Sequence, residues 1–285
     1  MLTDIKKNLY SPKFLISIFL IFLLCLLSDA PSVSARVPLS VLDEMVKMRR
    51  EIWLEKGVRF SAPSVFFGFD CSIWYSVILP VIAAFPVIYN FSDEWFGDNY
   101  IMTLSRSGYK KYTIGKILSA FITGFMTAIL GLLLFGITVY LIFPSVNEFA
   151  NAGKLYLSGT YAEPVKAIAA KVINNSLICG SYAVLAIFLC LVIRDKFFSL
   201  SVLMVINYFS IKLEIKFLNS EAFLNNEEIR WLRIFFPNCQ KDMYYFFPDY
   251  LDISFYFYIP AVVFLCLGVC AISFNLIKRR YRYGS

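Results

Sequence analysis

Histidine is absent from this sequence of 285 residues, and charged side chains are scarce. Asp, Glu, Lys and Arg together make up 16% of the chain, whereas soluble globular proteins contain about 25%. Without histidine, the chain has no His-based acid–base catalysis, no His-ligated metal and no His proton relay. The sequence also lacks the G-x-x-x-x-G-K-[ST] phosphate-binding loop. This second absence excludes ATP hydrolysis by a P-loop within this chain.

Apolar residues, in contrast, are abundant. They make up 59% of the chain, and the mean hydropathy is +0.67. They gather in long runs between charged segments, which is the pattern of a chain solvated partly by lipid and partly by water. Six runs predict membrane-spanning helices, over residues 14–28, 73–91, 117–143, 172–193, 197–213 and 253–277. The sequence therefore predicts one all-α, polytopic transmembrane domain that covers residues 1–285.

The first run is short for a spanning helix, and the residues after it allow a second interpretation. Val33-Ser34-Ala35 resembles a signal-peptidase site, so residues 14–28 are either an uncleaved first helix or a cleaved signal. We expect an uncleaved helix, because six spans place both termini on the same side of the membrane.

Ionisable side chains are missing from the middle of the predicted spans. The runs without any Asp, Glu, Lys or Arg are 73–91, 117–143, 172–193 and 253–277. Charges inside a membrane usually mark ion or proton pathways, so their absence argues against a proton-driven carrier and against an aspartyl intramembrane protease. In the fifth run Lys212 is the nearest charge, and Asn207 and Ser210 are the most polar features. We expect these two to bond to a neighbouring helix or to backbone, with a substrate contact as the alternative.

Basic residues give the predicted orientation. With the N-terminus in the cytoplasm, 13 of the 27 Lys and Arg fall in the short inner segments 1–13, 92–116, 194–196 and 278–285. Because cytoplasmic loops carry an excess of Lys and Arg, both termini are predicted to be cytoplasmic. The connection 194–196 is so short that the flanking helices should form an antiparallel hairpin. The outer segments are then residues 29–72, 144–171 and 214–252.

The outer segment 29–72 contains a helix signal. Ser40 can act as an N-cap, Asp43 and Glu44 follow in the first turn, and Gly57 can end the helix. Another helical stretch is expected near residues 163–171, and short interfacial helices are expected within 214–252.

Seven cysteines are present, and their spacing does not indicate a metal site. Five of them lie in apolar runs, where we expect small hydrophobic side chains: Cys25, Cys179, Cys190, Cys266 and Cys270. The other two, Cys71 and Cys239, fall in outer segments, where they either form a disulfide or stay separate.

Prolines and small residues indicate how the spans pack. Pro80 and Pro86 lie inside the second run, so neighbouring helices must satisfy the backbone carbonyls that these prolines leave free. In the third run Ala120, Gly124 and Ala128 recur at four-residue spacing. This stripe either lets another helix approach closely or is a scatter of small residues.

The predicted inner segment 92–116 is too long for a simple turn and too apolar for a free loop. Ser92 can cap a helix, with Asp93 and Glu94 favourable at its positive end. The residues that can form an apolar face on this helix are Trp95, Phe96, Tyr100, Ile101 and Leu104. The run Ser105 to Gly108 is expected to end it. Such an amphipathic helix either lies at the lipid interface or docks in a groove of a cytoplasmic partner.

Together with the order of the spans, this segment resembles the membrane subunits of type-2 ABC exporters, the permeases of bacterial drug, antibiotic and lantibiotic transporters. The resemblance rests on Glu94 after the second span, Gly97, the pair Ser105-Arg106, and Gly115-Lys116 at the start of the third span. The long outer segment 29–72 departs from the family pattern and leaves the subfamily open.

The resemblance implies a permease in the bacterial cytoplasmic membrane that exports an amphipathic peptide, lantibiotic or lipid-like drug. It implies a second permease subunit, identical or related, and a separate ABC ATP-binding subunit that holds ATP and Mg²⁺. The chain itself would have no catalytic, cofactor-binding or metal-binding residue. The segment after the second span would be the coupling helix that fits the ATPase. Its expected interface consists of Asp93, Glu94, Trp95, Phe96, Gly97, Tyr100, Leu104, Arg106, Tyr109 and Lys110.

Two rival functions remain open at the level of sequence. One is a membrane immunity or sensor protein that binds a peptide with its outer segments. The other is a membrane enzyme that uses outer carboxylates, for which Asp249 and Asp252 are the nearest pair. We expect this pair to cap the entry to the sixth span instead.

Overall fold

A computed structural model describes residues 2–28, 40–47, 60–68, 73–97, 99–145 and 164–218. Within these ranges the chain forms helices and no strand. In chain order the helices are α1 (Leu2–Leu9), α2 (Pro12–Leu26), α3 (Val41–Lys47), α5 (Ala62–Gly68), α6 (Ile73–Phe96), α7 (Asn99–Ser107), α8 (Tyr109–Ile142), α10 (Pro164–Ile193) and α11 (Lys196–Leu218). Several predicted features lie outside the described residues: the sixth span 253–277, Gly57, Cys71, Cys239, Asp249 and Asp252.

Four of the described helices are long and apolar enough to cross a membrane, which indicates a membrane protein. The stretches with these properties are Trp74–Phe96, Tyr109–Ile142, Lys171–Ile193 and Lys196–Phe217, in α6, α8, α10 and α11. The shorter apolar helix α2 has 15 residues and packs between α6 and α8. Ser11 caps it, because the Ser11 hydroxyl accepts a hydrogen bond from the Phe14 backbone N–H at 3.3 Å.

The helix boundaries differ from the predicted spans. The first span, predicted over 14–28, is helical from Pro12 to Leu26. The second continues past residue 91 to Phe96, and the third begins at Tyr109 instead of residue 117. The separate helical stretch expected near 163–171 belongs to α10, which begins at Pro164. Polar residues at the ends of the apolar runs thus continue the helices instead of ending them.

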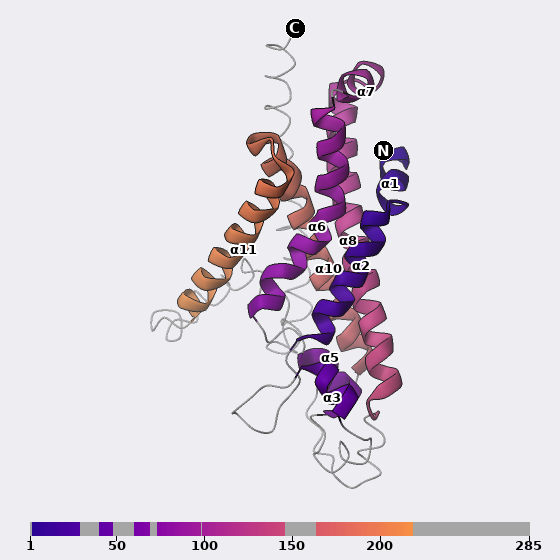
Figure 1. Ribbon diagram of the computed structural model, residues 1–285, viewed down its shortest axis with the longest axis vertical. Coiled ribbons are helices and arrows are strands. Elements are labelled where there is room, and N and C mark those ends of the chain that lie inside the picture. Colours follow the sequence, from indigo (N-terminus) through magenta and orange to yellow (C-terminus); the bar gives the residue numbers. More distant parts are fainter. Residues whose placement is uncertain are drawn as a thin grey trace.

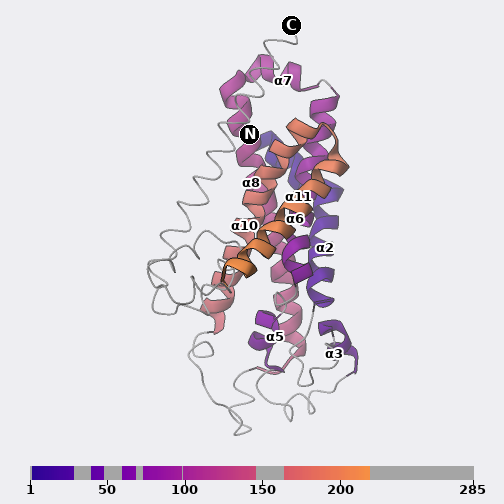
Figure 2. The ribbon, with the colours of Figure 1, turned by 90° about the vertical axis from the view of Figure 1, so that its left-hand side faces the viewer.

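The charged segments meet at one end of the bundle, which we call the charged end. Figure 1 places α7, α1 and the connection between α10 and α11 toward this end, and α3 and α5 at the opposite end. Figure 2 shows the same arrangement from the side. Two ion pairs join the inner segments directly, because Asp93 contacts Lys13 at 3.2 Å and Lys196 at 3.5 Å. The three described segments that were predicted to share the cytoplasmic side therefore lie together.

Helices α8 and α10 pack closely against each other. A Cβ atom added to Gly124 of α8 would lie 2.6 Å from the Cβ of Ala183 and 3.0 Å from the Cys179 carbonyl oxygen of α10. A Cβ on Gly180 of α10 would in turn lie 3.0 Å from the backbone oxygen of Phe121. Glycine is required at both positions because the two backbones approach so closely.

The two prolines inside α6 leave backbone carbonyls without their helical donors. Pro80 cannot donate to the carbonyl of Ser76, one turn earlier. The buried amide of Asn207 in α11 takes its place, since its Nδ2 donates to the Ser76 oxygen at 2.9 Å and to the Val77 oxygen at 3.1 Å. The prediction that Asn207 bonds to a neighbouring helix is confirmed.

A short connection joins α10 to α11, as expected from the sequence 194–196. Arg194 adopts a positive φ of 61°, which reverses the chain direction. The carboxylate of Asp195 then caps α11 by accepting a hydrogen bond from the Phe198 N–H at 2.7 Å. The two helices run in opposite directions and form the predicted hairpin.

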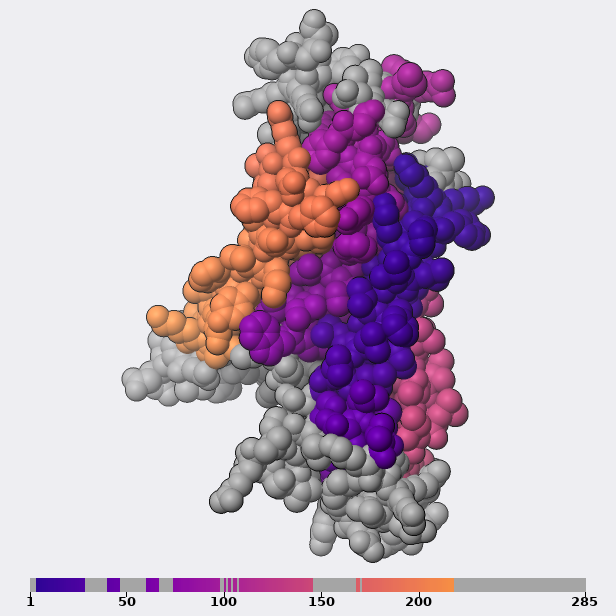
Figure 3. All heavy atoms as spheres, in the orientation of Figure 1, coloured from indigo at the N-terminus to yellow at the C-terminus, as the bar shows by residue number. Residues whose placement is uncertain are grey.

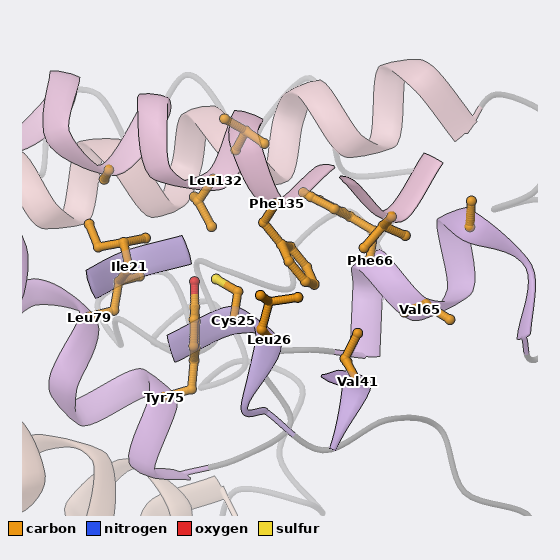
Figure 4. Close-up of a cluster of buried hydrophobic side chains, with 14 of the residues drawn as sticks. Ile21, Cys25, Leu26, Val41, Val65, Phe66, Tyr75, Leu79, Leu132 and Phe135 are labelled. Carbon is orange, nitrogen blue, oxygen red and sulfur yellow. The ribbon is translucent and has the colours of Figure 1, made fainter. Parts of the chain in front are cut away.

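A hydrophobic cluster holds the opposite end together. Figure 4 shows side chains from α2, α3, α5, α6 and α8 converging there, including Ile21, Val41, Phe66 and Phe135. The Phe66 and Phe135 rings stack with centroids 5.8 Å apart. This cluster ties the short helices α3 and α5 to the long ones.

Local hydrogen bonds fix α3 and α5 in place. Ser40 caps α3 as predicted, since its hydroxyl accepts from the Asp43 N–H at 3.1 Å. The Ala62 N–H at the start of α5 donates to the carbonyl of Pro144, just beyond α8, at 2.9 Å. The described parts of the outer segments therefore cover the end of the bundle.

Candidate functional site at the charged end

The amphipathic helix of the segment 92–116 is α7, and it is shorter than the sequence predicts. It covers Asn99–Ser107, and Gly108, with φ of +74°, turns the chain directly into α8. The expected helix start at Ser92 is wrong, because Ser92 lies inside α6 and its hydroxyl donates to the carbonyl of Tyr89 at 3.0 Å. Asp93 and Glu94 accordingly belong to the last turn of α6.

Aromatic side chains attach α7 to the bundle. Trp95, at the end of α6, is only 2% exposed and belongs to the hydrophobic cluster between α6, α8 and α10. Its ring lies 4.2 Å from that of Tyr100 in α7 and stacks on Phe91 with centroids 5.8 Å apart. The contact between Trp95 and Tyr100, two of the expected interface residues, therefore holds α7 against the end of α6.

Glu94 lies at the centre of a buried group of charges under α7. Its carboxylate accepts hydrogen bonds from the Tyr112 hydroxyl at 3.1 Å and from the Lys116 ammonium at 2.7 Å. The same Lys116 Nζ lies 2.6 Å from the Asp4 carboxylate of α1. Lys7 approaches Glu94 more loosely, at 3.9 Å. One lysine of α8 thus links the end of α6 to the N-terminal helix.

Lys116 also controls the titration of Asp4. Burial alone would raise the pKa of the Asp4 carboxyl, but the hydrogen bond and charge of Lys116 hold that pKa below its ordinary value of 3.8. Asp4 is consequently ionised at neutral pH and attracts Lys116. Stability that comes from this pair is present above pH 3.8 and is lost as the pH falls through the lower native pKa.

Amides and hydroxyls extend this network toward the middle of the bundle. Asn8 donates to Ser119 at 3.3 Å and to Thr123 at 3.2 Å, and it accepts from Asn90 at 2.9 Å. Most of these residues, with Glu94 and its charged partners, line a small cavity between α1, α6 and α8, to which Val87, Phe91 and Ile187 add apolar walls. The centre of a water molecule can occupy a volume of about 20 Å³ in this cavity, which is room for one or two water molecules.

A second charged group lies on the side of α6 that faces α2 and α11. Asp93 pairs with Lys13 at 3.2 Å and with Lys196 at 3.5 Å. Both ammonium groups also lie over the ring of Tyr89, at 4.6 Å and 4.3 Å from its centroid. We call these four residues the lysine pair site.

The outward side of α7 is exposed to solvent. Met102 is 68% exposed, and Arg106 is exposed one turn later. Phe96, Gly97 and Lys110, at the two junctions of α7, are exposed as well. Tyr109 is half-buried and packs with the Trp95 cluster. The side chain of Leu104 lies outside what the structure describes.

The expected interface residues therefore differ in their surroundings. Glu94 and Trp95 are buried at the end of α6, Tyr100 packs on Trp95 from α7, and Asp93 belongs to the lysine pair site. The expected residues on the surface are Phe96, Gly97, Arg106 and Lys110. The three small residues of α8 are buried in the bundle, with Ala120 in the cluster near the charged end and Ala128 in the cluster at the opposite end. Gly124 lies between them against α10.

Sequence reasoning missed the contribution of α1. Lys7 and Asn8 follow Asp4 by three and four residues, so a helix places both of them beside Asp4 on one face. This spacing was the available signal. The short polar stretch before the first apolar run gave no indication of its partner, since Lys116 is distant in sequence.

Comparison with protein-family models, with curated proteins and with solved structures gives no match to this chain.

Proposed function

We propose that the chain is the membrane-spanning permease subunit of an ATP-driven exporter and that α7 is its docking element for a separate ATPase subunit. The observation that carries this proposal is the position of α7. It is a short helix at the end of the bundle, and only short connections separate it from the membrane-length helices α6 and α8.

The structure of α7 suits a docking role. Its inner side is fastened through Tyr100 to the buried Trp95, and its outer side presents Met102 and Arg106 to solvent. A flexible methionine and an adjacent arginine suit a partner groove that is apolar with an acidic rim. A helix held in this way adds little ordering cost when a partner binds.

The buried charges beneath α7 support transmission of movement. Glu94 joins the end of α6 to α8 through Tyr112 and Lys116, and Lys116 joins both to α1 through Asp4. Separating these groups would leave a buried charge without its partner, which costs about 3–5 kcal/mol. Displacement of α7 by nucleotide-driven closure of the ATPase would therefore move α6, α8 and α1 together.

Export would take place in a bacterial cytoplasmic membrane through a pathway formed with a second permease subunit. ATP would shift an equilibrium between two conformations of this pathway. The described spans carry few charges, which suits an amphipathic cargo such as a peptide, a lantibiotic or a lipid-like drug.

The direct test is purification of the tagged chain from its native host in a mild detergent. We expect an ABC-type ATPase to co-purify and the complex to hydrolyse ATP. Arg106→Glu should abolish co-purification, because it reverses the charge on the exposed side of α7, yet membrane insertion should be unchanged.

Arg194→Glu is the matched control. Arg194 is exposed at the same end of the bundle but belongs to the α10–α11 connection, so the ATPase should be retained. Recovery of the chain without any ATPase, or equal loss in both variants, would contradict docking through α7. Saturable binding of an extracellular peptide by a chain that recruits no ATPase would instead indicate a sensor or immunity protein.

A further inference from the structure

The lysine pair site brings together two cations from helices far apart in the sequence. Lys13 is at the start of α2 and Lys196 is at the start of α11, and both point toward the same face of α6. Their ammonium groups share one carboxylate, Asp93, and one ring, Tyr89. Two lysines so close together require nearby negative charge, and Asp93 balances only one of them.

The helix ends add to this imbalance. The N-termini of α2 and α11 each contribute a partial positive charge of about one half, and the C-terminal end of α6 contributes a similar negative one. The Asp195 carboxylate, which caps α11, offsets the positive end of that helix. The site thus retains a net positive charge of about one unit, although Asp93 is present.

An aromatic strip continues from the lysine pair along α6 toward the middle of the bundle. Phe85, Tyr89 and Asp93 recur every four residues and so share one face of the helix. The Phe85 and Tyr89 rings are 4.9 Å apart, and Tyr89 meets the exposed ring of Phe197 edge-on at 5.9 Å. Figure 3 shows that α6 reaches the surface between α11 and α2.

We propose that the lysine pair site binds the headgroup phosphate of an anionic phospholipid, whose acyl chain lies along the Phe85–Tyr89 strip between α2 and α11. Three observations support a membrane lipid as the occupant. The site is cationic at the level where α2 and α11 begin, apolar and aromatic immediately deeper, and open at the surface. A lipid has the same order of charge and apolarity along its length.

The two lysines also take part in ion pairs that connect α2, α6 and α11. A structural role alone and a lipid-binding role make opposite predictions for Asp93. If Asp93 competes with phosphate for the lysines, its removal should strengthen lipid binding. If the lysines only connect the helices, removal of the Asp93 carboxylate should disrupt the site and weaken lipid binding.

The experiment is a titration of the purified full chain in detergent with phosphatidylglycerol or phosphatidylcholine, with bound lipid counted by native mass spectrometry. We expect the wild type to prefer phosphatidylglycerol by about twenty-fivefold, since each of the two lysines near the headgroup contributes on the order of a fivefold preference. The double variant Lys13→Gln/Lys196→Gln should lose this preference. Asp93→Asn should increase it.

The matched control is Lys6→Gln/Lys111→Gln, which removes the same charge from two exposed lysines of α1 and α8. This variant should keep the wild-type preference. Equal loss in both double variants, or weaker phosphatidylglycerol binding by Asp93→Asn, would overturn the proposal. So would complete displacement of the lipid by millimolar inorganic phosphate, which would assign the site to a free anion. The proposal does not depend on recruitment of an ATPase.

Discussion

At the scale of single residues, buried polar side chains give the bundle its specific geometry. Asn207 is the clearest case, because its amide is 2% exposed and serves a carbonyl that Pro80 leaves without a donor. A proline in one helix and an asparagine in another therefore act as a unit. The sequence of either helix alone gives no reason for the residue in the other helix.

This pairing can be tested by a double-mutant cycle. Asn207→Ala should lower the free energy of unfolding in detergent by about 1 kcal/mol, the size of a hydrogen bond within a membrane protein. In a Pro80→Ala background the same change should cost much less, because the substituted alanine has a backbone N–H that can donate to the Ser76 carbonyl. An equal cost in both backgrounds would show that Asn207 stabilises the bundle in another way.

The residues around Ser92 show where prediction from sequence fails. Ser92, Asp93 and Glu94 have the composition of a helix start, and capping of this kind contributes about 1 kcal/mol. Burial of Trp95 and the contact of Glu94 with Lys116 outweigh it, so α6 continues. Both depend on residues distant in sequence. By comparison, a bond from Asn207 to a neighbouring helix was predictable, because a polar amide in an apolar span needs a partner, although the sequence did not identify that partner as the Ser76 carbonyl. The capping of α3 by Ser40 was predictable because it is local.

At the scale of helices, the apolar runs of the sequence predict well which long helices are present. They predict poorly the residues at which those helices begin and end. The run that begins at Ile117 belongs to a helix that starts at Tyr109, since Lys110 and Lys111 can point to water while Tyr112 is buried. The small-residue stripe of α8 left two interpretations open. Contact of Gly124 with α10 is the finding that distinguishes them.

The contact between α8 and α10 predicts a rescue. Gly124→Ala should destabilise the protein by about 1–3 kcal/mol, because the new methyl group would overlap with Ala183. Addition of Ala183→Gly should restore part of this loss, because the contact of the new methyl group with the Cys179 carbonyl oxygen remains. Gly136→Ala is a matched control of smaller effect, since the nearest atom there is in the Phe66 ring at 3.2 Å and the ring can shift. Thermal unfolding in detergent measures all three, and a Gly124→Ala variant as stable as the wild type would refute the close contact.

At the scale of the whole molecule, the described chain has two distinct ends. The charged end gathers α1, α7 and the α10–α11 connection, and the opposite end carries α3 and α5 (Figure 1). The positions of Lys and Arg along the sequence predicted this grouping. The same positions predict that the charged end faces the cytoplasm.

Cysteine labelling tests that orientation. In a variant without the seven native cysteines, Ser105→Cys should react with a membrane-impermeant maleimide only after the cells are permeabilised. Val46→Cys, on the exposed side of α3, should react in intact cells. Both positions are exposed in the structure. Labelling of the two from the same side would contradict the orientation.

The length of α8 has a mechanical consequence. Its 34 residues form a rod of about 50 Å, longer than the roughly 30 Å hydrocarbon core of a bilayer. Gly124, where α8 lies close to α10, is near the midpoint of α8. If α8 tilted about this contact, its end beside α7 and its end beside α5 would move in opposite directions. In the proposed permease, displacement of α7 on one side of the membrane would then separate the helices on the other side.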